Sequence, residues 1–102
     1  MSKNIDVESM LGNAEMAAKW LKAIANPYRL MILCLLLEKE RSVTELNETV
    51  PLSQSALSQH LAVIRAQDLV NTRKSSQNVY YTLKNAEVTE VISILHRLYC
   101  AA

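Results

Sequence analysis

Glycine and proline are scarce in this chain of 102 residues, which contains one glycine and two prolines. Because both residues interrupt regular structure, their scarcity favours a helical protein with short connections. The chain also lacks a run of about 18 apolar residues, so we expect no membrane-spanning helix. Its N-terminal segment carries acidic residues and no continuous apolar stretch, which argues against a secretory signal. We therefore expect a cytoplasmic protein.

Positive charge is also limited. The formal net charge is +1 at pH 7, a value that does not by itself indicate a nucleic-acid-binding protein. The distribution of charge is more informative, because residues 53–84 contain a single acid, Asp68, and four bases: Arg65, Arg73, Lys74 and Lys84. Such a mildly basic face suits DNA contact, and its small excess predicts that binding depends on a dimer engaging two half-sites.

The chain length predicts a single domain, residues 1–102, with its first six residues disordered. Half of the residues are apolar, but a chain this short buries a modest fraction of its surface, so dimerisation would add stability. Apolar residues at helical spacing predict a first helix over 7–25. Asn26 and Pro27 then fit the N-cap and first position of a second helix, 27–38, which is apolar on nearly all sides and is expected to be central.

Two further helices, joined by a tight turn, are predicted in the middle of the chain. Ser42 and Glu45 have the spacing of a capping box, in which each side chain accepts a hydrogen bond from the backbone N–H of the other residue. The helix that they open is short, because Pro51 follows. Ser53 then fits the N-cap of the next helix, predicted over 53–66.

The predicted 53–66 helix has an apolar and a polar side. Leu57, Leu61 and Ile64 recur at spacings of four and three and form a buried stripe. On the other side, glutamine can bind adenine through two hydrogen bonds, serine can bind bases or phosphates, and arginine favours guanine or phosphate. An ordinary solvated helix face is the alternative, but the capping box, the short turn and the hairpin that follows favour DNA recognition. The outer side consists of Gln54, Ser55, Ser58, Gln59, Ala62 and Arg65.

A two-stranded hairpin is predicted after this helix. Asp68 ends the helix in the left-handed conformation that glycine usually supplies. β-branched and aromatic residues favour strands over 69–73 and 78–83, with residues 74–77 as the turn between them. We interpret the hairpin as a basic wing that lies along the DNA backbone, and a charged tip that serves only solubility is the alternative.

The final predicted helix, residues 86–100, is capped by Asn85. Its apolar stripe is too wide for a small domain to cover, so this helix and the first one form the candidate dimer interface. The predicted fold is mainly α with a small β-hairpin: a winged helix-turn-helix in which four helices are followed by two strands and a last helix.

Ten residues are candidates for DNA contact. Arg73 and Lys74 in the wing are predicted phosphate partners, and Gln77 and Asn78 could reach a minor groove. His60 lies at the edge of the buried stripe, so packing, helix capping and phosphate contact all stay open for it. The ten candidates are Ser53, Gln54, Ser55, Ser58, Gln59, His60, Arg65, Arg73, Lys74 and Gln77.

Three segments carry a family resemblance: residues 25–30 (ANPYRL), residues 52–61 (LSQSALSQHL) and residues 69–81. With them the chain resembles, over nearly its whole length, the ArsR/SmtB family of winged helix-turn-helix transcriptional regulators. Residues 32–34 (ILC) and 95–100 (LHRLYC) make it most similar to the HlyU-type activators and the BigR/SqrR-type sulfur sensors. The resemblance implies a homodimer, joined through its first and last helices, on a pseudo-palindromic DNA operator.

The chain departs from this subgroup at the end of the predicted recognition helix. Asp68 stands where glycine is usual, and Ala66 and Gln67 replace a more basic helix end. If position 68 is left-handed, the loss of glycine costs about 1 kcal/mol. The loss of positive charge should flatten the salt dependence of DNA binding.

The metal sites of many family members lack their ligands here. One family site uses a Cys-x-Cys pair, whose positions are occupied by Ser42 and Thr44, and hydroxyls cannot replace thiolates for a soft metal. The other needs Asp, His, His and Glu on the last helix, where Glu87, Glu90 and His96 do not have the required spacing. We therefore expect no metal or cofactor, with a metal-responsive repressor as an alternative.

Cys34 and Cys100 match the pair with which subgroup members sense oxidants or reactive sulfur. Such sensing requires an accessible thiolate with a resolving partner close by. A link between the second and last helices would act on the dimer-forming helix and change the spacing of the two recognition helices. Two packed, reduced thiols with no sensing role are the alternative, and a metal site built from them and His96 would lack a fourth ligand.

The sequence thus predicts a dimeric, sequence-specific, HlyU-like transcriptional regulator, associated with the nucleoid when bound to DNA and switched by oxidation or persulfidation of a cysteine pair. A winged-helix module for protein interaction without DNA binding is the alternative. No paired carboxylates, activated serine or closed Cys–His constellation indicates an enzyme. The residues do not specify the operator, the regulated genes, the direction of regulation or the oxidant.

Overall fold

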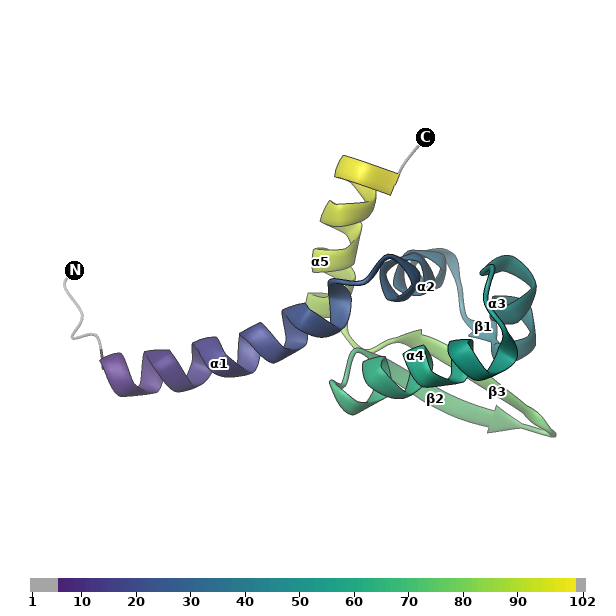
Figure 1. Ribbon diagram of the computed structural model, residues 1–102, viewed down its shortest axis with the longest axis horizontal. Coiled ribbons are helices and arrows are strands. Elements are labelled where there is room, and N and C mark those ends of the chain that lie inside the picture. Colours follow the sequence, from purple (N-terminus) through teal and green to yellow (C-terminus); the bar gives the residue numbers. More distant parts are fainter. Residues whose placement is uncertain (1–5, 101–102) are drawn as a thin grey trace.

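The computed structural model describes residues 6–100 (Figure 1). The predicted disorder of the first six residues falls on 1–5, outside the described range, and on Asp6, which instead caps a helix by accepting hydrogen bonds from the N–H groups of Glu8 (3.1 Å) and Ser9 (3.3 Å). The elements in chain order are α1 (Val7–Ile24), α2 (Pro27–Glu38), β1 (Arg41–Ser42), α3 (Val43–Thr49), α4 (Gln54–Ala66), β2 (Val70–Ser75), β3 (Asn78–Leu83), α5 (Ala86–Leu95) and a π-helical turn, η1 (His96–Cys100).

α1 and α2 meet at a sharp bend of 88°. The side chain of Asn26 accepts hydrogen bonds from the N–H groups of Tyr28 (3.0 Å) and Arg29 (3.1 Å). Pro27 occupies the start of α2, so the predicted cap is confirmed. Within residues 6–100 no single helix is long and apolar enough to cross a membrane, although α1 and α2 together pass that test by length and composition.

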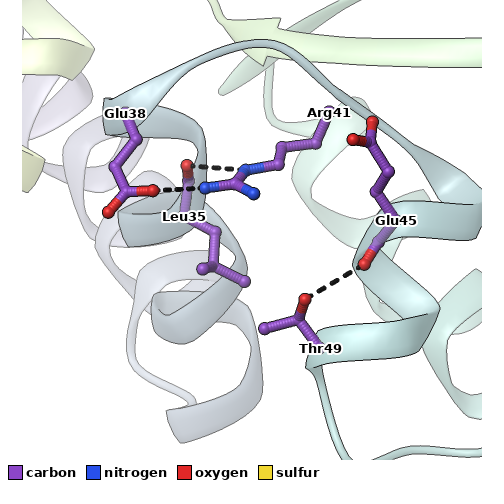
Figure 2. A network of polar contacts seen from close by, with 5 residues as sticks. All are labelled: Leu35, Glu38, Arg41, Glu45 and Thr49. Atoms are coloured by element: carbon purple, nitrogen blue, oxygen red, sulfur yellow. Dashed lines mark hydrogen bonds and ion pairs between the residues drawn. The ribbon is translucent and has the colours of Figure 1, made fainter.

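α2 lies at the centre of the core, as predicted. Ile32, Leu33 and Leu36 are buried, and the helix packs against α1, α4, α5 and β3. Arg41 crosses the C-terminal end of α2: its Nε donates to the carbonyl of Leu35 (3.3 Å), and its guanidinium pairs with Glu38 (Figure 2). Arg41 thereby satisfies a carbonyl near the helix end, where partners within the helix run out.

Both predicted caps of the helix-turn-helix unit, α3 and α4, are confirmed. The N–H of Ser42 donates to Oε1 of Glu45 (2.8 Å), and the N–H of Glu45 donates to Oγ of Ser42 (3.1 Å). Oγ of Ser53 accepts a hydrogen bond from the N–H of Ala56 (3.2 Å) at the start of α4. The predicted apolar stripe of α4 is also confirmed, because its members are all buried: Leu57, Leu61 and Ile64.

The sheet has three strands where the sequence predicts two. Its order is β1-β3-β2, with both pairings antiparallel. The additional strand, Arg41–Ser42, pairs with Tyr81 and Tyr80 of β3. A two-residue strand is too short to show the alternating pattern by which strands are recognised in a sequence.

The wing, β2 and β3 with the loop between them, has a tighter turn than predicted. Ser75 pairs with Asn78, so the loop contains only Ser76 and Gln77, and Lys74 is a strand residue. The backbone of Ser76 has a φ of 57°. A positive φ at the first loop position matches the turn types that join strands through two residues, because their twist fits that of the strands.

Asp68, two residues after the end of α4, adopts the predicted left-handed conformation, with a φ of 57°. The N–H of Asp68 donates to the carbonyl of Arg65 (3.0 Å), and the N–H of Leu69 donates to the carbonyl of Ile64 (3.0 Å). These two bonds define a Schellman motif. Leu69 and Ile64 are both fully buried, so the motif directs the chain into the core and on to β2.

α1 and the last helical segment carry the apolar surface that the core leaves uncovered. α1 projects away from the other elements (Figure 1), and residues 7–19 are all exposed. The last helix departs from prediction in one respect: α5 ends at Leu95, and the chain continues as η1 to Cys100. The large exposed apolar side chains on these segments are Val7, Met10, Leu11, Met16, Leu21, Ile94, Leu98 and Tyr99.

Candidate nucleic-acid interface and cysteine pair

α4 presents an exposed polar side opposite its buried stripe. Ser55, Ser58 and Gln59 are all exposed, and their side chains are small or able to form several hydrogen bonds. Such side chains let the helix backbone come close to base edges in a major groove. Ser53 has a different role: its Oγ caps the helix through Ala56 and lies 3.4 Å from Oγ of Ser55.

Gln54 and Arg65 lie at the two ends of this polar side, and both are exposed. Gln54 lines a cavity of about 260 Å³ together with Thr44 and Glu48 of α3. Arg65 stands in the last turn of α4, where a positive charge also complements the negative end of the helix dipole.

His60 joins a junction of three helices. Its ring centroid is 5.9 Å from that of Tyr28, and its Nδ1 is 3.2 Å from Nη1 of Arg29. The guanidinium of Arg29 also donates to the backbone carbonyls of Ala23 (2.6 Å) and Lys22 (3.3 Å) at the end of α1. The structure therefore brings His60 together with α1 and α2. Sequence reasoning missed Arg29, whose only signal is its position in the 25–30 segment.

The wing base Arg73 is paired with a carboxylate. Its Nε and Nη2 donate to the two carboxylate oxygens of Glu40 at 2.8 Å and 2.7 Å, and its Cζ lies 4.5 Å from the centroid of the Tyr80 ring. The hydrogen bond from Arg73 holds the pKa of Glu40 below its usual value, and the same bond raises the pKa of Arg73. Sequence reasoning treats Arg73 as a free phosphate partner and misses Glu40, which lies 33 positions away.

Lys74 and Gln77 lie at the exposed end of the wing. Lys74 pairs with Val79 across the hairpin, and Gln77 is in the two-residue loop. Arg73 forms a salt bridge with Glu40, whereas the salt bridges found within residues 6–100 do not include Lys74.

Cys34 of α2 and Cys100 of η1 lie side by side. Their sulfur atoms are 3.9 Å apart, with the Cys34 thiol as donor, and Cys34 is half-buried whereas Cys100 is exposed. Burial raises the pKa of Cys34 to about 12, with smaller contributions from the hydrogen bond and the charge of Cys100. Cys34 is therefore protonated at neutral pH, and Cys100 is the thiol that solvent reaches.

The two thiols share a cavity of about 370 Å³ with apolar and polar neighbours. Leu30, Met31 and Leu35 supply apolar surface, and His96 lies beside them. Within residues 6–100 no group of three or more His, Cys, Asp or Glu side chains is arranged to hold a metal ion. The cavity thus gives a small molecule access to a pair of thiols.

The sequence and the fold are similar to those of known bacterial regulators. Residues 26–72 match the family model described as bacterial regulatory protein, arsR family. The transcriptional activator HlyU of Vibrio cholerae is 54% identical over 98 residues, which cover 96% of this chain and 91% of the relative.

Solved structures extend this similarity to the whole fold. Reduced HlyU from Vibrio cholerae has a TM-score of 0.85 at 56% identity, with 91% of this chain and 98% of the other covered. The transcriptional repressor BigR from Xylella fastidiosa has a TM-score of 0.81 at 35% identity, with 94% and 95% covered. The winged helix-turn-helix fold is thus shown, and the chain is a DNA-binding transcriptional regulator and not an enzyme. It belongs to the ArsR family of bacterial regulatory proteins.

Proposed function

We propose that the chain regulates transcription as a homodimer that inserts two α4 helices into the major groove of a pseudo-palindromic operator. The observation that carries this proposal is the division of α4 into a fully buried stripe and an exposed side that is rich in hydrogen-bonding groups. Ser55, Ser58 and Gln59 contact base edges or phosphates, and Lys74 and Gln77 extend the contact along the flanking backbone. Such a regulator acts in the cytoplasm and is nucleoid-associated when bound.

The uncovered apolar side chains of α1 and α5 support the dimer. An 18-residue helix with residues 7–19 exposed gains little from packing within one chain. A second copy would bury these side chains, and apolar burial contributes about 25 cal/mol per Å². Two copies would also place two α4 helices on one face of the assembly, as two half-sites about one helical turn apart require.

The cysteine pair supports a thiol switch. A peroxide oxidises the Cys100 thiolate to a sulfenic acid and leaves as water or an alcohol, and the Cys34 thiolate then displaces water to form a disulfide. With a sulfane-sulfur donor, the Cys100 thiolate takes the outer sulfur and releases a thiolate, and Cys34 then displaces hydrosulfide. Either route removes two electrons from the pair. The sulfur atoms must approach from 3.9 Å to about 2.05 Å.

This closure links the core helix α2 to η1, which continues the helix proposed to form the dimer. The sulfur–sulfur distance must fall by nearly 2 Å, and the part of this change that rotation of the two side chains does not supply moves η1 relative to α2. A shift at the dimer interface changes the spacing of the two α4 helices, and only such a difference between the two states can alter DNA affinity.

Replacement of side chains on α4 tests the recognition surface. In Ser55→Ala, Ser58→Ala and Gln59→Ala variants, preference for the operator over random duplex should fall, by about 1–3 kcal/mol for a side chain that makes a bidentate base contact. The matched control is Ser93→Ala, because Ser93 is exposed on α5. Competition gel shifts with labelled operator measure the ratio. Unchanged discrimination in all three variants would rule out α4 as the recognition helix.

Replacement of the thiols tests the switch separately. Peroxide or a sulfane-sulfur donor should change the DNA affinity of the wild-type protein and have no effect on Cys34→Ser or Cys100→Ser. Mass spectrometry of the intact protein should show the loss of two hydrogens in the treated wild type. A full response in both variants would refute the switch and leave the DNA-binding proposal intact.

A further inference from the structure

A second cavity of about 370 Å³ lies where the end of α1, the start of α2 and the end of α4 meet. Three of its lining side chains are basic, and no acidic side chain lines it. The complete lining consists of Lys19, Lys22, Ala23, Arg29, Val63 and Gln67. None of these six residues is among the ten candidates for DNA contact that the sequence indicates.

The positive charge of this cavity is partly fixed in place. Arg29 donates to the carbonyls of Ala23 and Lys22, so its guanidinium cannot leave the cavity wall without breaking those bonds. Lys19 and Lys22 are three residues apart on α1, a spacing that places them on one side of the helix. Both are exposed, and the salt bridges found within residues 6–100 include neither. Two mobile ammonium groups thus stand beside one fixed guanidinium.

The cavity also adjoins the recognition surface. Gln59, Val63 and Gln67 are spaced four residues apart, so they form one row along α4. Gln59 belongs to the exposed polar side, and the other two line the cavity. A duplex held against the polar side of α4 therefore has one of its sugar-phosphate strands close to the end of this row.

We propose that this cavity binds a phosphodiester of the DNA strand that flanks the major groove occupied by α4. Lys19 and Lys22 approach the phosphate oxygens as flexible point charges, and Arg29 adds a fixed positive potential. The proposal rests on α4 as the recognition helix. It also adds to the positive charge of the helix-turn-helix and wing, where Arg73 is paired with Glu40.

The salt dependence of DNA affinity tests this proposal. Each phosphate contact that is lost lowers the slope of log K against log salt by about 0.9. One phosphodiester per cavity is two per dimer, so Lys19→Gln/Lys22→Gln should lower the slope of a dimer by about 2. The loss should be equal for operator and random duplex, because phosphate contacts carry no sequence information. The control is Lys39→Gln, which removes one positive charge from an exposed position outside the cavity and should leave the slope nearly unchanged.

The possible results separate this site from the rest of the interface. An unchanged slope in Lys19→Gln/Lys22→Gln, or an equal fall in the control, would overturn the phosphate site. Gln59→Ala is expected to lower the preference for the operator without changing the slope, because Gln59 lies on the recognition side of α4 and does not line the cavity. Backbone amide shifts of Val63 and Gln67 give a second readout. If these amide chemical shifts change when millimolar inorganic phosphate is added but not when a short duplex is added, the cavity binds a free anion and the DNA contact is refuted.

Discussion

Asp68 should lower the stability of the protein, because it occupies a backbone conformation that suits glycine. The left-handed conformation costs a residue with a Cβ about 1–2 kcal/mol. This cost is smaller for aspartate than for alanine. Its carboxylate also stands near the negative end of the α4 dipole, where a negative charge costs about 0.3–1 kcal/mol. Against this, glycine loses more backbone entropy on folding, by about 0.5–1 kcal/mol. The balance predicts that Asp68→Gly stabilises the fold by about 1 kcal/mol.

Three variants at this position separate the contributions. Asp68→Asn removes the charge and keeps the shape, so it should stabilise by about 0.5 kcal/mol. Asp68→Ala removes the same charge but leaves a Cβ without a polar group, so it should be less stable than Asp68→Gly by about 1 kcal/mol. Urea unfolding followed by circular dichroism, at one fixed protein concentration, gives the free energies. Equal stability of the alanine and glycine variants would show that the left-handed backbone carries no strain.

Three further outcomes are expected. Ser42→Ala should lower the free energy of unfolding by about 1–2 kcal/mol, measured in urea, because it removes half of a buried capping box; a change below the error of the measurement would contradict this. Glu40→Gln should release Arg73 and make the salt dependence of DNA binding steeper, by about 0.9 for each new phosphate contact, whereas an unchanged slope would show that the ion pair does not restrain the wing base. The pKa of about 12 for Cys34 predicts that its attack on oxidised Cys100 accelerates about tenfold per pH unit from pH 7 to 10 in stopped-flow traces, and a flat profile would show that another step limits closure.

Local signals in the sequence predicted most of the fold. Caps at Asn26 and Ser53, the capping box at Ser42 and the left-handed Asp68 all depend on residues within a few positions of one another. Hydrogen bonds over such short separations are set by residue type and spacing, so they can be read without knowing the tertiary structure. The buried stripe of α4 follows in the same way from the helical period.

Contacts between distant segments could not be read from the sequence. Glu40 meets Arg73 only because β1 adds to the edge of the sheet, and β1 is too short to give a signal of its own. His60 meets Arg29 because α2 packs against α4 in the core. Sequence reasoning therefore found the exposed polar side of α4, but not which nearby charges are already engaged.

Ser42 takes part in both the sheet and the cap of α3, and it thereby couples the wing to the helix-turn-helix unit. Its backbone lies in β1 opposite Tyr80, while its side chain and its N–H cap α3 through Glu45. Separation of β1 from β3 would disturb the first turn of α3, and fraying of α3 would free the sheet edge. Amide hydrogen exchange at the base of the wing and in α3 should therefore occur through one shared opening reaction. The wing and the two helices would then move as one unit, and in the proposed homodimer the control of DNA binding would come from how two such units are positioned.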